Sequence, residues 1–199
     1  FAPSLAPDSQ TLLYFGTLIR KKGLLELPHI FNLIHEKNPA AELVLVGKDA
    51  ADIITGNSSV WKMMQPLFTP SALRQVRYVG PVPYDEMRQW IAKATVCMFP
   101  TFAEALPVSW LEAMAVQKPL VASNIGWAPE IIDHGINGFL VHPTDHQVYA
   151  DYVLELLANP EKAAAMAQAA REKIDAQFRV EKVAAQLVAT YQEIITKIQ

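Results

Sequence analysis

The chain has 199 residues, of which 51% are hydrophobic, and its 17 basic and 20 acidic side chains give a formal net charge of −3. This size suits one α/β domain with a substantial core, so we expect residues 1–199 to form a single domain with no room for a second full one. Because the charges are scattered and no basic block occurs, nucleic acid is not expected as a partner.

The first part of the chain predicts strands that alternate with helices. Short runs of leucine, valine and aromatic residues predict buried strands, and apolar residues at three- and four-residue spacing predict helices. In chain order, we expect an entry segment rich in proline and serine at 1–10, a strand at 11–15, a helix at 24–36, a strand at 43–47, a helix at 60–68 inside the irregular segment 48–70, and a strand at 76–80.

The same alternation continues to the end of the chain. Pro107 suits the first turn of a helix because proline has no N–H to lose there and its φ is already helical. In chain order, we expect a helix at 86–94 capped by Asp85, a strand at 95–100, a helix at 107–117, a strand at 119–123, a short helix at 129–133, a strand at 139–141, and helices from Asp145 onward that are broken at 159–160 and 177–179.

This order predicts a fold of the α/β class, a Rossmann-like doubly wound parallel sheet with helices on both faces. In such sheets, ligands bind outside the carboxyl ends of the strands. That rule places the loops 16–22, 47–48, 80–82, 101–107 and 123–126 on one rim, where the binding site is expected.

Two carboxylates follow the fourth strand, Glu104 in a loop and Glu112 in the next helix. Glu112 is the only charged side chain from Pro107 to Gln117, and a helix that is apolar nearly all round is expected to be buried. A buried carboxylate needs a partner. A ribose diol would supply two O–H donors. The alternative is a narrow solvent-facing stripe or a pair with Lys118, and the segment alone leaves both interpretations open.

Three consecutive cations, Arg20, Lys21 and Lys22, precede Gly23 at the start of the first helix. Across the same rim, the N-terminus of the helix near Pro107 offers unpaired N–H groups and a partial positive charge. Together they could grip a pyrophosphate. The alternative is an ordinary solvated turn, which is the usual role of a run of charges.

Several other sites are disfavoured by what the sequence lacks. It contains no P-loop, no Gly-x-Gly-x-x-Gly fingerprint and no Gly-x-Ser-x-Gly elbow. His142 and His146 have the spacing of helical metal ligands, but Pro143 lies between them and nothing completes the set, so no metal is expected. The four tryptophans are expected in the core or at a domain interface rather than as ligand platforms.

Compartment and anchoring can also be predicted. Cys97 is the one cysteine and lies in an apolar strand, so we expect no disulfide and no cysteine metal site, and a reducing, cytoplasmic location. No apolar run approaches the roughly 18–20 residues that span a bilayer. The first residues lack the basic start of a signal peptide, and Phe1 in place of methionine suggests a part excised from a longer protein.

From Glu104 to Glu112 the sequence has the form Glu-x-x-Pro-x-x-x-x-Glu-Ala-Met-Ala, with Leu111 before the second glutamate. This resembles the Glu-x7-Glu motif in the nucleotide-binding, C-terminal half of retaining glycosyltransferases of the GT-B fold, group 1 (family four). The resemblance covers about Leu12 to Asp145. Supporting segments in the family's order and spacing are 118–126, 129–132 and 135–141.

The resemblance implies a role for each matched residue. Glu112 would hold the ribose hydroxyls of a nucleotide-diphosphate sugar, the donor, and Glu104 would be the catalytic residue beside the transferred sugar. Lys22 would neutralise the diphosphate as charge develops. No metal and no separate cofactor are implied. The remaining expected substrate-binding residues are Arg20, Gly16 and Thr17, the backbone of Ala105, Leu106 and Pro107, and Val82 near the base.

Two departures from the family pattern keep other functions open. Thr17 stands where the family usually has arginine, and Arg20 or Lys21 would have to supply that charge. The family's N-terminal acceptor domain is absent, so a hexosyltransferase-type enzyme is expected only as part of a longer protein. We expect the final helix, 180–198, to pack toward that domain, through which peripheral membrane contact could also occur. The alternatives are a non-catalytic nucleotide-sugar binding module and a sugar-nucleotide epimerase of the same fold.

Overall fold

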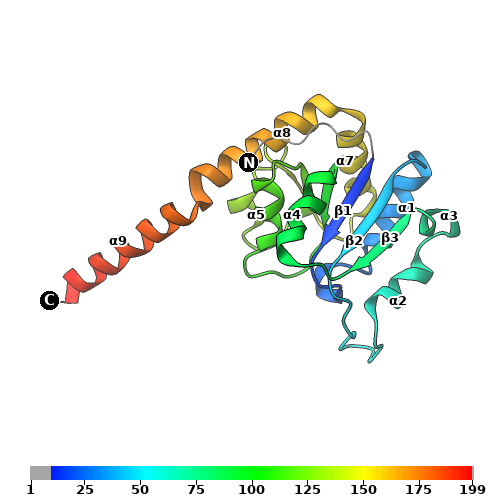
Figure 1. Cartoon of the computed structure of the whole chain (residues 1–199), viewed down its shortest axis with the longest axis horizontal. Coiled ribbons are helices and arrows are strands. Elements are labelled where there is room, and N and C mark those ends of the chain that lie inside the picture. The colour runs from blue at the N-terminus through cyan, green and yellow to red at the C-terminus, as the bar shows by residue number, and fades with distance from the viewer. Residues whose placement is uncertain (1–9, 199) are drawn as a thin grey trace.

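The computed structural model describes residues 10–198, so nearly all of the predicted entry segment at 1–10 lies outside the described residues. Their centre is a six-stranded sheet with strand order β3-β2-β1-β4-β5-β6 (Figure 1). Every pairing between neighbouring strands is parallel. The strands are β1 Thr11–Phe15, β2 Glu42–Val46, β3 Val76–Gly80, β4 Val96–Phe99, β5 Leu120–Ser123 and β6 Phe139–Val141.

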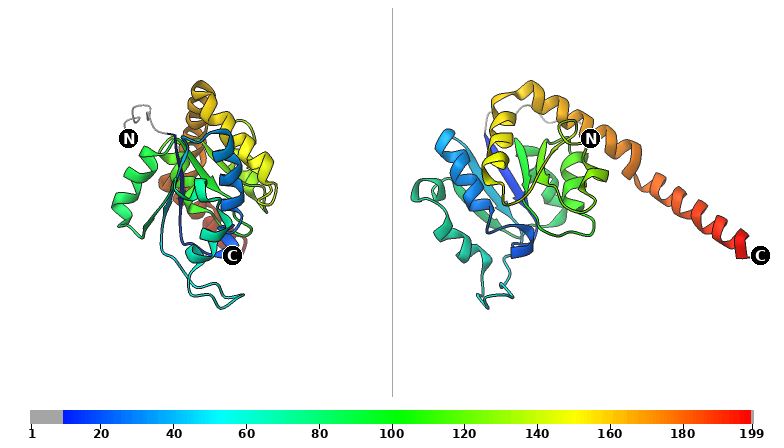
Figure 2. Two further views of the ribbon diagram at one scale, coloured as in Figure 1. Left: turned by 90° about the vertical axis from the view of Figure 1, so that its right-hand side faces the viewer. Right: turned by 180° about the vertical axis from the view of Figure 1, so that it is seen from behind.

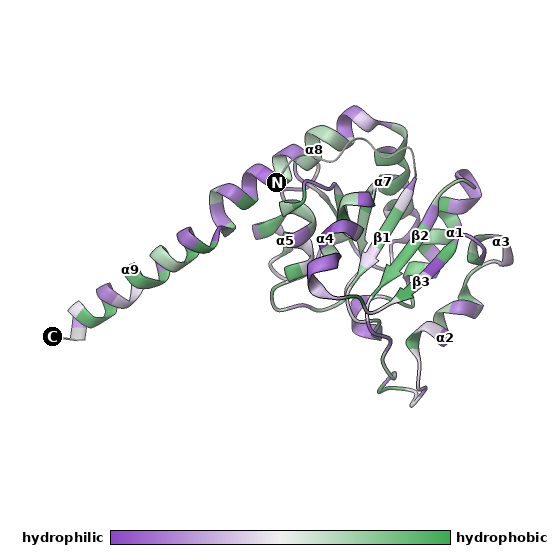
Figure 3. Cartoon of the chain, viewed as in Figure 1, coloured by the Kyte–Doolittle hydropathy of each residue, from purple (hydrophilic) through white to green (hydrophobic). Residues whose placement is uncertain are grey.

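The predicted fold class is confirmed, and the six predicted strands overlap the six observed ones. The central strands are apolar along their length because both faces of the sheet are covered. All four residues of β4 and of β5 are buried, and the strands stand out as hydrophobic in Figure 3. Strand order reverses between β1 and β4, which creates the crevice where ligands bind in doubly wound folds.

Helices cover both faces of the sheet. Figure 2 shows α1 and α7 on one face and α4 on the other. Leu27, Ile30, Phe31 and Ile34 form the buried stripe of α1 at helical spacing. The helical segments are η1 Arg20–Lys22, α1 Leu27–Lys37, α2 Val60–Met64, η2 Gln65–Leu67, α3 Pro70–Leu73, α4 Tyr84–Lys93, α5 Val108–Ala115, α6 Ala128–Ile131, α7 His146–Ala158, α8 Pro160–Lys173, η3 Ile174–Phe178 and α9 Val180–Ile198.

Three predicted helix starts are wrong. The helix expected from Leu24 begins at Leu27, because 23–26 form a turn. Asp85 lies in the first turn of α4 rather than at its cap, which is Pro83, in an extended conformation with ψ of 143°. Pro107 is the cap residue of α5 rather than part of its first turn, because its ψ of 83° is not helical. In α4 and α5 alike, the proline is the last residue of the loop and the helix begins at the residue after it.

The single helix predicted at 60–68 is in fact two pieces. Ser59 caps α2 by accepting a hydrogen bond from the backbone N–H of Lys62. Pro66 lies within η2 and has no N–H for an α-helical hydrogen bond, so the α-helix ends at Met64 and continues as a 3-10 turn. Thr69 then caps the short helix α3, which the sequence prediction missed.

The C-terminal end of α5 is closed by a Schellman motif. The N–H of Lys118 donates to the carbonyl of Ala113, and the N–H of Gln117 donates to that of Met114, both at 3.0 Å. Gln117 has a φ of 59°, the left-handed conformation usually taken by glycine. The helix therefore ends at Ala115, two residues before the predicted end.

The last helix, α9, leaves the body of the molecule and projects into solvent (Figures 1 and 2). Every residue from Val180 to Lys197 is exposed, although apolar side chains recur along the helix (Figure 3). Among the described residues, no helix combines the length and apolar character needed to cross a membrane.

Candidate functional site

Glycines end three neighbouring strands at the carboxyl rim. The N–H of Gly16 donates to Val46 at 2.9 Å, and the N–H of Gly47 donates to Gly80 at the same distance. A Cβ on Gly47 would lie 2.0 Å from the carbonyl oxygen of Gly16, so the two backbones meet where a side chain would not fit. These strand ends therefore lie together at the carboxyl edge of the sheet, as predicted, and next to Gly16 the surface of this edge consists of backbone atoms.

The loop after β1 packs against the loop after β4. Gly23, with a φ of 72°, packs so closely that an added Cβ would lie 1.6 Å from the carbonyl oxygen of Pro100. The N–H of Phe102 and the hydroxyl of Thr101 both donate to the carbonyl of Lys21, at 2.8 and 3.2 Å. These contacts fix the short turn η1 against the segment that carries Glu104.

Lys22 and Glu104 meet as a result. The Nζ atom of Lys22 lies 3.2 Å from Oε1 of Glu104, and the two side chains are 24% and 18% exposed. The cavity beside them has a volume of about 10 Å³, room for about one water molecule. Tyr14 donates from its hydroxyl to the carbonyl of Thr17 at 3.0 Å, and burial, followed by the charge of Glu104, raises the pKa of Tyr14 well above its usual value.

Glu112 lies on the partly exposed side of α5. Trp110, Ala113 and Met114 form the buried stripe of this helix, while Val108 is 54% exposed and Glu112 is half-buried. The expectation of a fully buried helix is therefore wrong. An all-apolar sequence was the basis for it, but only one stripe of α5 packs on the core.

The hydroxyl of Tyr84, the first residue of α4, donates to Oε1 of Glu112 at 2.6 Å. The suggested pair of Glu112 with Lys118 is wrong, since Lys118 is buried past the end of α5 and forms no ion pair with Glu112 in the described part of the chain. Burial also lowers the pKa of Lys118. Glu112 thus lies on a partly exposed side of α5, as in the solvent-facing alternative, and its hydroxyl donor is a tyrosine.

Arg20 points to a different partner from its neighbour Lys22. Its Nε and Nη2 atoms donate to the two carboxylate oxygens of Asp52, at 2.9 and 2.8 Å. Thr55 also donates to Asp52, through its hydroxyl at 2.6 Å and its N–H at 3.0 Å. The hydrogen bonds from Arg20, then those from Thr55, hold the pKa of Asp52 well below its usual range. The pair of Arg20 with Asp52 therefore ties the turn after β1 to the loop after β2.

The remaining predicted site residues are distributed along the rim. Thr17, Ala105 and Leu106 are exposed. Pro107 is buried, and the N–H that follows it, on Val108, donates to the carbonyl of Leu106 at 2.9 Å. Val82 is partly buried and packs against the core.

Sequence reasoning missed Tyr84 and Asp52. Tyr84 follows the rim loop 80–83 directly, so an aromatic residue at that position was an available signal. Asp52 lies in the irregular loop, and nothing local in the sequence indicates that it pairs with Arg20.

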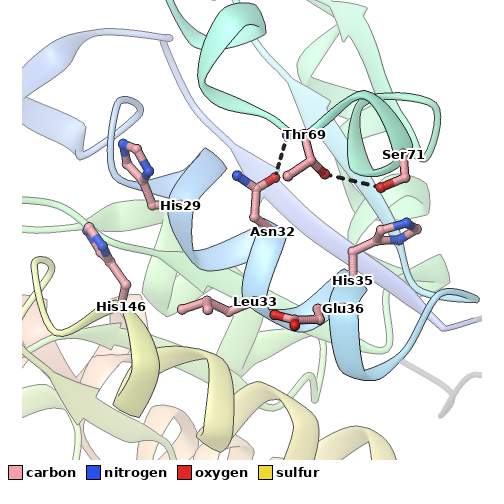
Figure 4. Close-up of a pocket in the computed structure, with 8 residues that line it drawn as sticks. All are labelled: His29, Asn32, Leu33, His35, Glu36, Thr69, Ser71 and His146. Carbon is pink, nitrogen blue, oxygen red and sulfur yellow. Dashed lines mark hydrogen bonds between the residues drawn. The ribbon is translucent and has the colours of Figure 1, made fainter.

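A larger cavity of about 610 Å³ lies between α1, the start of α3 and the start of α7 (Figure 4). None of the predicted site residues lines it, and its lining contains Glu36 but no lysine or arginine. His146 hydrogen-bonds to Glu26 at 2.7 Å and stacks on His29, with 5.2 Å between ring centroids. Without a fixed cation, this cavity is poorly suited to a diphosphate.

In the described part of the chain, no group of three or more histidine, cysteine, aspartate or glutamate side chains is arranged to hold a metal ion. His142 is hydrogen-bonded to Thr144 rather than facing His146. Cys97 is fully buried, and burial raises the pKa of its thiol to about 12.

The fold and the rim together define a class of protein. A doubly wound parallel sheet carries Lys22 against Glu104 on the loops after β1 and β4, with Glu112 on the following helix. In doubly wound sheets, ligands bind at this carboxyl edge. Residues 1–173 match the family described as Glycosyl transferases group 1. The chain belongs to this retaining family and corresponds to the C-terminal, donor-binding half of its GT-B enzymes.

Individual relatives are similar over most of this chain. The α-maltose-1-phosphate synthase of Mycolicibacterium smegmatis is 30% identical over 91% of the chain and 47% of its own length. The solved sucrose-phosphate synthase of Thermosynechococcus elongatus superposes with a TM-score of 0.82, at 26% identity, over 97% of this chain and 47% of its own. Anabaena HepE, solved with UDP and glucose, gives a TM-score of 0.78 at 26% identity over 93% and 48%. The chain thus spans about half the length of these relatives.

Proposed function

We propose that this chain is the donor-binding part of a retaining glycosyltransferase of the hexosyltransferase type, which transfers a sugar from a nucleoside-diphosphate sugar to an acceptor. Acceptor recognition and part of the catalytic apparatus would come from an N-terminal domain of the longer protein. A reducing, cytoplasmic location suits the buried thiol of Cys97.

The contact between Lys22 and Glu104 carries this proposal. These residues belong to different loops, and the resemblance assigned one to the diphosphate and the other to the sugar. At 3.2 Å they are close enough for one sugar diphosphate to touch both. The two side chains are mostly shielded from water, so a donor that separates the pair would have to offer a phosphate to Lys22 and a hydroxyl to Glu104 in exchange.

The chemistry follows from where charge develops. As the bond between sugar and diphosphate breaks, negative charge grows on the departing phosphate, and a fixed ammonium beside it stabilises the transition state more than the ground state. Lys22 would supply that ammonium. Glu104, released from Lys22, would face the sugar, which carries growing positive charge at the same moment.

A second candidate, a binding module without turnover, is favoured by the position of Arg20. The arginine expected after Gly16 is replaced by exposed Thr17, and Arg20 is held in a two-point pair with Asp52. Arg20 is therefore engaged by Asp52, which leaves Lys21 as the other candidate for the missing charge, while Lys22 contacts Glu104.

Two measurements separate these functions. Calorimetry of this chain with UDP, GDP and ADP, and with the corresponding sugars, tests donor binding, and we expect one base to be preferred. A turnover assay on the intact protein with the preferred donor tests transfer. Binding with transfer supports the enzyme, binding without transfer supports the module, and no binding of any of these nucleotides contradicts both.

A further inference from the structure

Tyr84 is an exposed tyrosine whose hydroxyl is hydrogen-bonded to Glu112. Its side chain is 80% exposed, while its hydroxyl lies 2.6 Å from Oε1 of Glu112. An exposed aromatic ring gains little from packing, so the charge-assisted hydrogen bond is the contact that orients it. The hydrogen bond to Glu112 and then the charge of that carboxylate raise the pKa of Tyr84. The hydroxyl therefore keeps its proton and remains a donor near neutral pH.

The position of this hydrogen bond joins two elements of the expected site. Tyr84 begins α4 directly after the rim loop 80–83, and Glu112 lies on α5. The resemblance assigns the loop to the base and Glu112 to the ribose. The tyrosine hydroxyl therefore lies on an oxygen of the carboxylate to which the resemblance assigns the ribose.

We propose that Tyr84 is a positioning residue whose hydroxyl takes the place of a ribose hydroxyl on Glu112 and competes with the ribose hydroxyls of the donor for that carboxylate oxygen. This inference rests on the proposed function. The side chain can leave because its ring is largely in solvent. A carboxylate has about four lone-pair sites, and the tyrosine hydroxyl takes one of them on Oε1 at 2.6 Å. A ribose diol that binds both oxygens competes with Tyr84 for that site, so part of the ribose's contribution to affinity is offset by the weakened bond from Tyr84.

The test compares Tyr84→Phe with the unchanged chain, using whichever of UDP, GDP and ADP binds best and its 2′,3′-dideoxy analogue. Phenylalanine keeps the ring and removes only the hydroxyl. We expect the nucleoside diphosphate to bind roughly threefold to tenfold more tightly to the variant, the typical net effect of one hydrogen bond. The dideoxy analogue has no hydroxyl to displace Tyr84, so its affinity should not change. Tyr191→Phe, an exposed tyrosine on α9, is the matched control and should leave both affinities unchanged.

Three outcomes overturn the inference while leaving donor binding intact. Unchanged affinity for the nucleoside diphosphate would mean that Tyr84 does not compete. Weaker binding would mean that Tyr84 contacts the donor directly. Equal tightening of the nucleotide and its dideoxy analogue would mean that Tyr84 obstructs the site sterically and not through Glu112. If the unchanged chain binds none of the three nucleotides, the proposed function fails and this inference fails with it.

Discussion

Glu112 is the residue on which nucleotide recognition depends in this account. Replacing it by glutamine keeps the size of the side chain and removes the charge, so hydrogen bonds from ribose weaken. We expect Glu112→Gln to reduce the affinity for a nucleoside diphosphate by about 1.5–3 kcal/mol. Calorimetry measures this loss, and thermal unfolding is the control. Unchanged affinity with an altered unfolding temperature would make Glu112 a structural residue.

Lys22 should contribute to the affinity for the diphosphate part of a ligand and not to the affinity for the nucleoside. Lys22→Ala removes the cation and also leaves Glu104 unpaired beside the incoming anion, so we expect a loss of roughly 10-fold or more in affinity for the nucleoside diphosphate. The affinity for the corresponding nucleoside should not change. Lys93, which is exposed at the C-terminal end of α4, provides the matched variant Lys93→Ala with little expected effect. Equal losses for nucleotide and nucleoside would contradict the phosphate role of Lys22.

The lowered pKa of Asp52 leads us to expect that the free energy of unfolding depends on pH. Its pKa is lowered in the folded chain by Arg20 and Thr55, whereas an unfolded aspartate titrates near about 3.9. The stabilisation is therefore fully present above that value and is lost as the pH falls below it. We expect Asp52→Asn to lower the free energy of unfolding at pH 7, with a difference from the unchanged chain that shrinks below about pH 4.

Urea unfolding at pH 7, 5 and 3.5 checks this prediction. Asp151→Asn is the comparison, because Asp151 pairs with Lys37 while half-exposed, and exposed pairs contribute little. A difference between Asp52→Asn and the unchanged chain that stays constant across the pH range would show that the charge of Asp52 is not what stabilises the loop.

The sequence was sufficient to nominate Lys22, Glu104 and Glu112 because each stands at a fixed place in a motif next to a strand end. It was not sufficient for their partners. Tyr84 with Glu112 and Arg20 with Asp52 are contacts between segments far apart in the chain. Such contacts are decided by how the loops pack, and no local pattern encodes them.

At the scale of elements, Gly23 connects the fold to the site. An alanine there would meet the carbonyl oxygen of Pro100 and would also be strained by the φ of 72°. Gly135 has a similar φ of 80° but open space around it. We expect Gly135→Ala to cost about 1 kcal/mol of stability, from strain alone, and Gly23→Ala to cost at least about 2 kcal/mol.

Chemical denaturation of both glycine variants measures this difference. Gly23→Ala should also weaken nucleotide binding, because η1 and Lys22 would shift away from Glu104. Equal losses of stability in the two variants would contradict the tight packing of the β1 loop on the β4 loop.

The strands could be predicted within about one or two residues because buried parallel strands are continuous apolar runs. Boundaries failed where backbone details decide them. Pro83, rather than Asp85, caps α4, and Pro107 ends a loop instead of lying in the first turn of α5. Gln117 has a left-handed conformation that ends α5 early, and the apolar pattern of the helix does not indicate it. The turn η1 forms because Gly23 packs on Pro100, a contact between distant segments.

At the scale of the whole molecule, α9 extends away from the sheet and its helices, with the residues from Val180 to Lys197 exposed. Its exposed apolar residues recur at three- and four-residue spacing: Val180, Val183, Leu187, Tyr191 and Ile194. A stripe of this kind is typical of a helix that packs against another body, and the resemblance predicts that this body is the N-terminal domain. Most of the stability of a helix in a protein comes from packing of its apolar face, which α9 leaves exposed.

A chain ending at Arg179 should therefore keep its stability and its nucleotide affinity. We expect its thermal midpoint to change by less than about 2 °C. In the longer protein, amide hydrogen exchange across 180–198 should be slower than in this chain, because the apolar stripe would be covered. A large loss of stability on truncation would contradict the position of α9 outside the core.

The most direct test of the account is a crystal structure of this chain with the nucleoside diphosphate that binds best. The account predicts ribose hydroxyls within hydrogen-bond distance of Glu112, the diphosphate at Lys22, and the hydroxyl of Tyr84 moved off Glu112. A nucleotide bound elsewhere, such as in the cavity beside His29 and His146, with Tyr84 still on Glu112, would contradict it.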